Sequence, residues 1–212
     1  MKQHILIKNS TIVNEGKVFI ADILVSNGFI QQIGNIGIEA NHKVIDGTGK
    51  HLFPGVIDCQ VHFRDPGLTH KGDLYSESKA AVAGGVTSFI DMPNTVPNIL
   101  TAESLKEKYE IASNKSLANY SFFLGVNGDN IDDIIKTDTS QFIGVSDDGL
   151  YFTKKGNLLA DNPETMEKLF ANCKSIIAIH SEKEQIIEGN EQAFREKYGD
   201  DVPAKFHPDI RS

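Results

Sequence analysis

The sequence predicts an α/β fold in which a small N-terminal β-sheet precedes a parallel sheet covered by helices. Three observations predict it. Short stretches that alternate apolar and polar residues fill the first 50 positions. From Pro54 onward, strand-like and helix-like segments follow one another, which is typical of βαβ units. About five such units are present, whereas a closed (β/α)8 barrel needs eight and roughly 250 residues. The region is therefore either part of a (β/α)8 TIM barrel or a shorter open α/β fold.

The N-terminal sheet is predicted from hairpin patterns. Its alternating stretches are residues 4–9, 17–25 and 29–33. Asn27-Gly28 is the most specific turn signal among them, because a two-residue hairpin turn needs positive φ at both positions. We assign residues 1–52 to a small β subdomain and residues 53–212 to the α/β part.

The α/β part begins with a strand at residues 55–61, where β-branched Val56 and Ile57 are bounded by turn residues on both sides. The same alternation of element types continues along the rest of the chain. Later strands are predicted at about 86–92, 120–126, 141–146 and 175–180, and helices at about 73–83, 102–113, 130–135, 163–172 and 182–197.

Composition excludes several classes of partner. The 212 residues carry a formal net charge of −8 and no basic block, which argues against nucleic acid and anionic membranes. No apolar run approaches the ~20 residues that span a bilayer, and the N-terminus lacks the apolar region of a signal peptide. Cys59 and Cys173 show no metal-binding spacing, and Cys59 is expected to be an inert core thiol. We expect a cytoplasmic protein with a small-molecule substrate, and leave self-association into a homo-oligomer open.

Polar side chains gather where the predicted strands end. Period-2 alternation sends Asp58, Gln60 and His62 to one face of the first strand. The ends of later strands carry Asp91 and Asn94, then Asp147 and Asp148, then His180. Active sites of barrels lie at the C-terminal ends of strands, so we expect a pocket there. An imidazole in this place suits Zn²⁺, and a hydrogen-bonded histidine without a metal explains His62 about equally well.

The first strand resembles the Asp-x-His-x-His strand of the amidohydrolase superfamily, with Gln60 in place of the first histidine. Phe-Arg-Asp-Pro-Gly at residues 63–67 and Met-Pro-Asn-Thr at residues 92–95 are similar to the dihydroorotase branch. The resemblance covers essentially the whole chain. It implies that residues 53–212 are the N-terminal part of an amidohydrolase barrel. It also implies that residues 1–52 form a composite subdomain with chain beyond Ser212.

The resemblance implies Zn²⁺ as cofactor, with one or two ions. It makes His62 a metal ligand, and His180, followed by Ser181, resembles the family histidine that binds the second metal. The alternative for His180 is a histidine at a helix N-terminus beside a capping serine. Gln60 is expected to weaken one metal site, because a neutral amide is a poor Zn²⁺ ligand beside imidazole.

A carboxylate after the fourth strand is the expected bridge between two metals. Residues 156–159 resemble the Gly-Asn-Met-Leu of one branch, and alignment backward from them places Asp148 on the bridging position. Residues 146–149 also resemble the Asp-Asp-Gly of the aspartate-bridged branch. Asp148 is therefore the candidate and Asp147 the alternate. The plain alternative is a solvated Asp-Asp-Gly turn.

Arg64 and Asn94 are the expected substrate-binding residues. The planar guanidinium of arginine binds carboxylates with two parallel hydrogen bonds, and asparagine supplies both a donor and an acceptor. In the family the corresponding residues bind the substrate's carboxylate. The alternatives are a surface ion pair of Arg64 with Asp58 or Asp65, and a turn-forming Asn94.

The resemblance implies a dihydroorotase, which interconverts N-carbamoyl-L-aspartate and dihydroorotate in pyrimidine biosynthesis through a metal-bound hydroxide. The family's catalytic aspartate lies beyond Ser212, so no catalytic residue is assigned and the 212-residue chain alone is expected to be inactive. One alternative is an allantoinase or hydantoinase, whose ring need not present a carboxylate. Another, suggested by Gln60, is a catalytically silent homologue with a scaffold or partner role. The segment from His207 to Arg211 also resembles a family element and receives no role.

Overall fold

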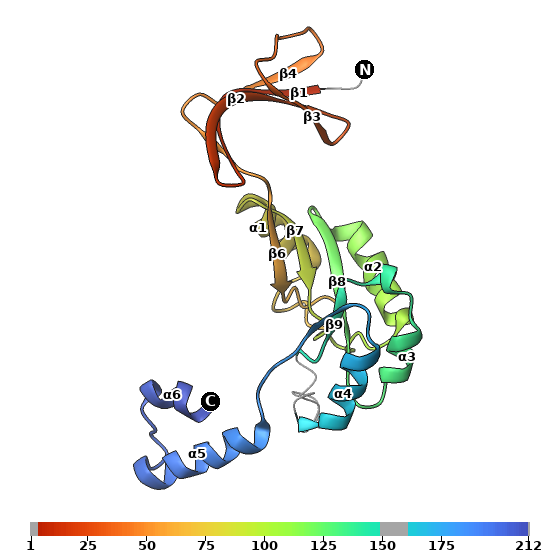
Figure 1. The fold of residues 1–212 in the computed structure, drawn as a ribbon, viewed down its shortest axis with the longest axis vertical. Coiled ribbons are helices and arrows are strands. Elements are labelled where there is room, and N and C mark those ends of the chain that lie inside the picture. Colours follow the sequence, from red (N-terminus) through yellow and green to blue (C-terminus); the bar gives the residue numbers. More distant parts are fainter. Residues whose placement is uncertain (1–3, 149–160, 212) are drawn as a thin grey trace. The chain divides into compact units, whose positions relative to one another are not determined.

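The computed structural model describes residues 4–148 and 161–211. The chain divides into two compact units, Met1–Gly55 and Val56–Ser212, which Figure 1 colours red to orange and orange to blue. The predicted α/β class is confirmed, since the first unit is a β-sheet and the second is a parallel sheet with helices. No helix in the described ranges is long and apolar enough to cross a membrane.

The first unit is a five-stranded sheet. Its strands are β1 (His4–Asn14), β2 (Lys17–Ser26), β3 (Phe29–Gly34), β4 (His42–Asp46) and β5 (His51–Leu52). The order is β3-β2-β1-β4, and β5 also pairs with β1. The first three strands form two antiparallel hairpins, whereas β4 and β5 run parallel to β1. Asn27 and Gly28 have φ of 52° and 82°, as the predicted hairpin turn requires.

Asp22 is a buried charge at the centre of this sheet. It is 4% exposed and accepts hydrogen bonds from Lys8 Nζ at 2.7 Å and from the backbone N–H groups of Asn9 and Ile36, both at 2.9 Å. The Lys8 ammonium and these two amides lower the pKa of Asp22 to about 2. The carboxylate thereby fixes the bulge in β1, where Asn9 has φ of 57°.

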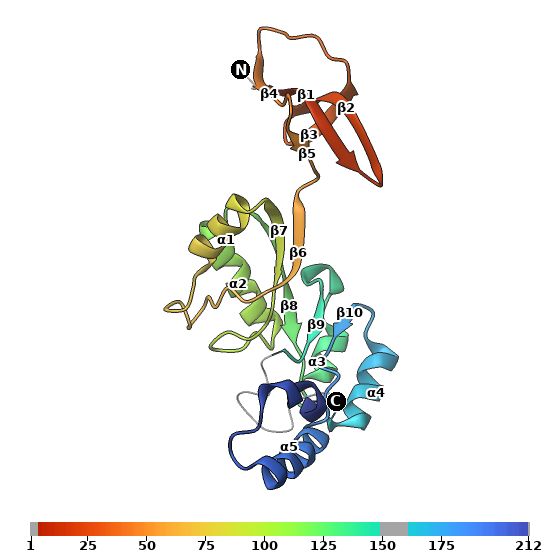
Figure 2. The same cartoon turned by 90° about the vertical axis from the view of Figure 1, so that its left-hand side faces the viewer.

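The second unit is built on five parallel strands in chain order. They are β6 (Val56–Val61), β7 (Val86–Asp91), β8 (Asn119–Gly125), β9 (Gly144–Ser146) and β10 (Ile176–Ala178). Figure 2 shows that they run in one direction. The predicted part-barrel is confirmed. Two strands are shorter than predicted, and a 3₁₀ turn, η1 (Thr139–Gln141), occupies the start of the fourth.

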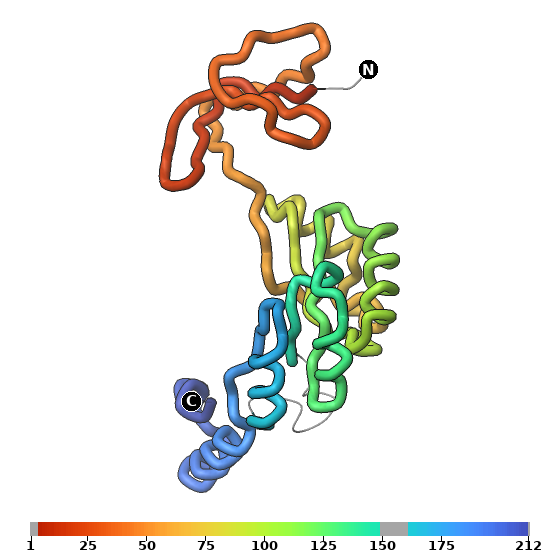
Figure 3. The backbone as a smooth tube through the Cα atoms, turned by 45° about the vertical axis from the view of Figure 1, so that its right-hand side comes forward, coloured from red at the N-terminus to blue at the C-terminus, as the bar shows by residue number. Residues whose placement is uncertain are grey.

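Helices of the second unit follow its strands, and the first four connect successive strands whereas the last two come after β10. They are α1 (Leu74–Ala83), α2 (Ala102–Lys115), α3 (Ile131–Lys136), α4 (Pro163–Asn172), α5 (Glu184–Tyr198) and α6 (His207–Arg211), with a 3₁₀ turn η4 (Ala204–Phe206) before the last. Both α1 and α2 begin at capping boxes, formed by Asp73 with Ser76 and by Thr101 with Ser104. In Figures 1 and 3, α2 and α3 lie along one face of the sheet.

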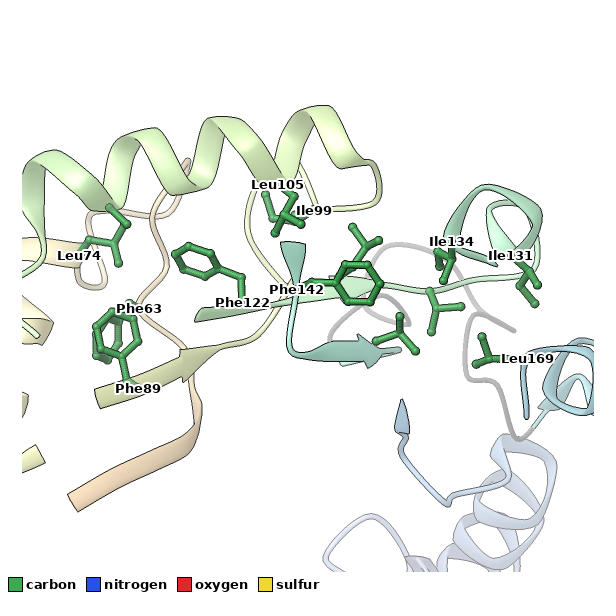
Figure 4. Packing of buried hydrophobic residues seen from close by; sticks show 14 residues of the cluster. Phe63, Leu74, Phe89, Ile99, Leu105, Phe122, Ile131, Ile134, Phe142 and Leu169 are labelled. Atoms are coloured by element: carbon green, nitrogen blue, oxygen red, sulfur yellow. The ribbon is translucent and has the colours of Figure 1, made fainter. Parts of the chain in front are cut away.

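The core of the second unit lies between the sheet and these helices. The rings of Phe63 and Phe89 lie 4.4 Å apart between centroids and are tilted by 44°, and Phe122 on β8 points toward α2, as Figure 4 shows. Helix α2 buries Leu105 and Ala112 against this cluster, together with one lysine, Lys108. Burial of large aromatic side chains is the main stabilising contribution in such a core.

The two edge strands of this sheet expose apolar residues. In the described part of the chain, β6 and β10 each pair along one edge, and Ile57 and Ile176 are 65% and 58% exposed. Cys59 on β6 is exposed as well. The expectation of a core thiol was therefore wrong, because strand parity predicts which face a residue occupies but not whether another element covers that face.

Candidate active site

The candidate site lies where β6, β7, β9 and β10 end. His62 follows β6 directly, Asn94 is in the loop after β7, Asp147 and Asp148 follow β9, and His180 follows β10. Parallel pairing in chain order brings these C-terminal ends to one edge of the sheet. Ser146 and Gln60 face the same pocket as His180, among apolar side chains that include Ile90, Met92 and Phe123.

Three of the predicted residues form one hydrogen-bonded cluster. Asn94, 8% exposed, places its amide nitrogen 2.8 Å from His62 Nδ1 and donates to Asp148 Oδ1 at 3.4 Å. His62 Nε2 lies 3.5 Å from Asp148 Oδ2. Because the Asn94 amide donates to Nδ1, the ring proton of a neutral His62 lies on Nε2, facing the carboxylate. The cluster thus orients both the imidazole and the carboxylate.

Gln60 joins the edge of this cluster. Its amide nitrogen lies 3.5 Å from Asp148 Oδ2, at the outer limit for a hydrogen bond. Its side chain is exposed, and its backbone N–H donates to Asp58 Oδ1 at 3.2 Å. Gln60 therefore presents an N–H donor to Asp148, whereas a neutral imidazole in this place could offer a nitrogen lone pair to a metal.

The neighbouring aspartates Asp147 and Asp148 serve different partners. Asp147 is fully buried and accepts from the backbone N–H of His180 at 3.0 Å, with His180 Nδ1 at 3.2 Å. Asp148 is 4% exposed and faces His62 and Asn94. Its own N–H donates to Ser146 Oγ at 3.1 Å. A solvated turn is thereby excluded for both residues. Residues 156–159, used in the alignment, lie outside the described ranges.

Arg64 follows His62 by two residues and has a left-handed backbone conformation, with φ of 63°. Its side chain is half-buried and forms no ion pair with any described residue. Asp65 instead accepts from Lys115 Nζ at 2.7 Å and from the Leu74 N–H at 3.3 Å. The surface ion pair of Arg64 with Asp65 is thus not formed, and the guanidinium is not neutralised by a neighbouring carboxylate in the described part of the chain.

The loops that carry Arg64 and Asn94 are packed against each other. The Val96 N–H donates to Pro66 O at 3.3 Å. Gly67 has φ of 83°, and a Cβ there would lie 1.9 Å from the Val96 carbonyl oxygen. Only glycine allows this approach without displacing backbone. The glycine of Phe-Arg-Asp-Pro-Gly therefore sets the spacing between the two candidate substrate-binding segments.

The donor chemistry of the site suits zinc, with two imidazoles and a carboxylate among the predicted ligands. In the described residues, however, no three His, Cys, Asp or Glu side chains come together as a metal-binding group. His62 and Asp148 are neighbours, whereas His180 is engaged by Asp147. The structure brings two of the three predicted ligands together.

Sequence reasoning missed the lysines that support the site. Lys108 and Lys115, both on α2, contact Asp91 and Asp65 respectively. A sequence signal was present, because Lys108 lies between Leu105 and Ala112 on the apolar face of the predicted helix. A lysine at such a position is normally assigned to solvent.

Comparison with known proteins gives a consistent set of relatives. Residues 49–202 match the family described as dihydro-orotase-like. A dihydroorotase of Methanosarcina acetivorans is 34% identical over 210 residues, which is 97% of this chain and 43% of that protein. An allantoinase of Bacillus velezensis is 32% identical over 193 residues, which is 88% of this chain and 42% of that protein.

Comparison with solved structures supports the same family of folds. The L-hydantoinase (dihydropyrimidinase) of Arthrobacter aurescens matches with a TM-score of 0.82 and 28% identity, over 95% of this chain and 45% of that one. The chain thus spans less than half the length of the relatives it matches.

Proposed function

The chain belongs to the dihydro-orotase-like family, and from that premise we propose that it forms the carboxylate-binding part of a cyclic amide hydrolase of the dihydroorotase type. The reaction interconverts N-carbamoyl-L-aspartate and dihydroorotate, a step of pyrimidine biosynthesis. Ring closure joins the carbamoyl nitrogen to the side-chain carboxyl carbon and releases water. Hydrolysis adds water across the same bond. The second carboxylate of the substrate is not consumed and is available for binding.

The observation that carries this proposal is the cluster of Asn94, His62 and Asp148, which Arg64 adjoins in sequence two residues after His62. We assign the unreacting carboxylate to Arg64, whose guanidinium has no carboxylate partner among the described residues and can form two charge-assisted hydrogen bonds. Asn94 Oδ1 is buried and has no hydrogen-bond partner in the described part of the chain. It is therefore suited to accept from an N–H of the ring or ureido group.

We further propose that His62, Asp148 and His180 supply ligands to zinc, one or two ions being the alternatives. Zinc would supply Lewis-acid activation of water and of the amide carbonyl. The part played by the chain itself is to hold a ligand in place, since Asp147 orients His180. Isothermal titration of the chain with zinc tests this, and a His62→Ala variant should bind at least about 10-fold more weakly.

A second candidate is a hydantoinase or allantoinase, and the relatives of both kinds favour it. The two candidates differ in one chemical feature, because a hydantoin-type ring need not present a carboxylate. A silent homologue, suggested by Gln60, would bind neither ring and little metal. Metal content therefore separates the silent homologue from the enzymes, and the ligand's carboxylate separates the enzymes from each other.

The discriminating experiment compares two ligands that share one ring. Dihydroorotate and 5,6-dihydrouracil differ only in the carboxylate. A dihydroorotase-type site should bind dihydroorotate at least about 10-fold more tightly, the contribution of a charge-assisted hydrogen bond. Equal affinity for both ligands would favour the hydantoinase candidate, and no binding of either would favour the silent homologue.

A further inference from the structure

A charged lysine lies in the core directly behind the candidate site. Lys108 on α2 is 1% exposed, and its Nζ lies 2.8 Å from Asp91 Oδ2, on a carboxylate that is itself 1% exposed. The ammonium also donates to the Met92 carbonyl at 3.2 Å and lies 4.8 Å from the centroid of the Phe122 ring. The two polar contacts of the ammonium thus lie at the end of β7.

The contacts of Lys108 lead to both candidate substrate-binding segments. Asp91 accepts the Phe63 N–H through Oδ1 at 3.1 Å, and Phe63 directly precedes Arg64. Met92, whose carbonyl accepts from Lys108, stands two residues before Asn94. The Met92 N–H in turn donates to Val61 O at 3.0 Å. One ammonium therefore connects the segment after β6 with the segment after β7.

Stability alone is a poor reason for this arrangement. Burial lowers the pKa of Lys108, and the charge of Asp91 opposes that shift. The attraction within the pair therefore compensates its desolvation penalty only in part. Apolar residues of similar volume are often at least as stabilising in such places. The ion pair and the hydrogen bond to the Met92 carbonyl do, however, hold the groups they join, because the ammonium contacts both at once.

We propose that Lys108 is a positioning residue for the site, and that through Asp91 and the Met92 carbonyl it holds the Arg64 and Asn94 segments in register for a ligand that bears a carboxylate. This inference rests on the proposed function for the identity of that ligand, but not for the positioning itself. Lys108 touches neither candidate substrate-binding side chain and acts through the backbone.

The second lysine of α2 supports the same interpretation. Lys115 stands seven residues after Lys108, on the same side of the helix, and its Nζ lies 2.7 Å from Asp65 Oδ2. Asp65 directly follows Arg64 and is 3% exposed. The segment around Arg64 is thus held on both sides from one helix, by Lys108 through Phe63 and by Lys115 through Asp65. Because Lys115 is 42% exposed, its replacement should have the smaller effect.

The test must separate positioning from simple charge compensation. Lys108→Met keeps the apolar stem and removes the ammonium, which leaves Asp91 uncompensated. The double variant Lys108→Met/Asp91→Asn also removes that charge and keeps an oxygen that can accept the Phe63 N–H. The matched control is Lys106→Met, an exposed lysine on the same helix. Thermal unfolding of the 212-residue chain ranks the stability of all forms.

The ligand-free readout is the position of the Arg64 Nε–H and Asn94 Nδ2–H resonances in NMR spectra of the chain, since Lys108 contacts neither group. Positioning predicts that these resonances shift or double in the single and double variants, although the double variant regains stability. They should stay unchanged in Lys106→Met. The proposal would be overturned if the double variant regained stability and its Arg64 and Asn94 resonances stayed at the wild-type positions. Lys108 would then only compensate the charge of Asp91.

The ligand readout is the ratio of affinities for dihydroorotate and dihydrouracil. We expect the preference for dihydroorotate to fall about tenfold in the double variant, the loss of roughly one charge-assisted hydrogen bond, with dihydrouracil affected less. Equal loss for both ligands would contradict the positioning role. If the wild-type chain shows no preference, the proposed function fails, and the NMR readout still decides the role of Lys108.

Discussion

Replacing Lys108 by methionine is expected to destabilise the second unit by about 3–5 kcal/mol, the cost of breaking a buried ion pair on one side. Both members of the pair are 1% exposed. The variant loses a charged hydrogen bond to the Met92 carbonyl, worth about 1.5–3 kcal/mol. Among the described residues, it also leaves the Asp91 carboxylate with only the Phe63 N–H as a partner. Methionine keeps the apolar stem of lysine, so little packing is lost.

Urea unfolding followed by circular dichroism measures this change as a shift of the midpoint. Lys106→Met, on the exposed side of α2, should stay within about 0.5 kcal/mol of the unchanged protein. The double variant with Asp91→Asn should recover a large part of the loss, because the unpaired charge is removed. A loss below about 1 kcal/mol for Lys108→Met would refute the reasoning, since it would mean that the ammonium does not compensate a buried carboxylate.

Three other predictions concern the backbone, pH and activity. Gly67→Ala should cost at least about 1–2 kcal/mol and more than Gly85→Ala in thermal unfolding, because both have positive φ but only Gly67 would place a Cβ against the Val96 backbone. The pKa of Asp22 is lowered from 3.8 to about 2, so its contribution to stability is complete above about pH 4 and is lost as the pH falls toward 2. The difference in unfolding free energy between the protein and Asp22→Asn should therefore shrink over that range, and a constant difference would contradict the assignment. The 212-residue chain alone should not hydrolyse dihydroorotate above a His62→Ala control in a product assay, and turnover above that control would show that the chain needs no further strands.

Local patterns predicted most elements of this fold. The strand-helix alternation after Pro54 placed β6 to β10 and α1 to α5 within a few residues, because period and turn residues are properties of short segments. β4 and β5 were not predicted. They are short, and they exist only through parallel pairing with β1, which depends on contacts between segments far apart in the sequence.

The candidate site was predicted in its residues and only partly in its geometry. Strand parity and resemblance named His62, Asn94 and Asp148, and the structure places them in one cluster. The sequence could not predict that Asp147 would contact His180 while Asp148 faces His62 and Asn94. Both residues follow the end of β9, where the alternation of strand faces no longer applies. Lys108 was missed because a charged residue is buried only when its partner arrives from another element, here Asp91 of β7.

The helix at the end of the described chain had no predicted role. The structure shows that α6 begins at His207 and that Arg211 pairs with Glu182, two residues after His180. This ion pair lowers the pKa of Glu182. It joins the last helix to the segment that carries one of the proposed zinc ligands, a contact that spans 29 residues of sequence.

The most direct test of the proposed function is calorimetric titration of the chain and of Arg64→Gln with dihydroorotate and dihydrouracil, with Lys71→Gln as a control from the same loop. We predict that the chain prefers dihydroorotate at least about 10-fold, that Arg64→Gln abolishes the preference, and that Lys71→Gln retains it. A preference that survives in Arg64→Gln, or equal affinity for both ligands in the unchanged chain, would contradict a carboxylate-binding site at Arg64.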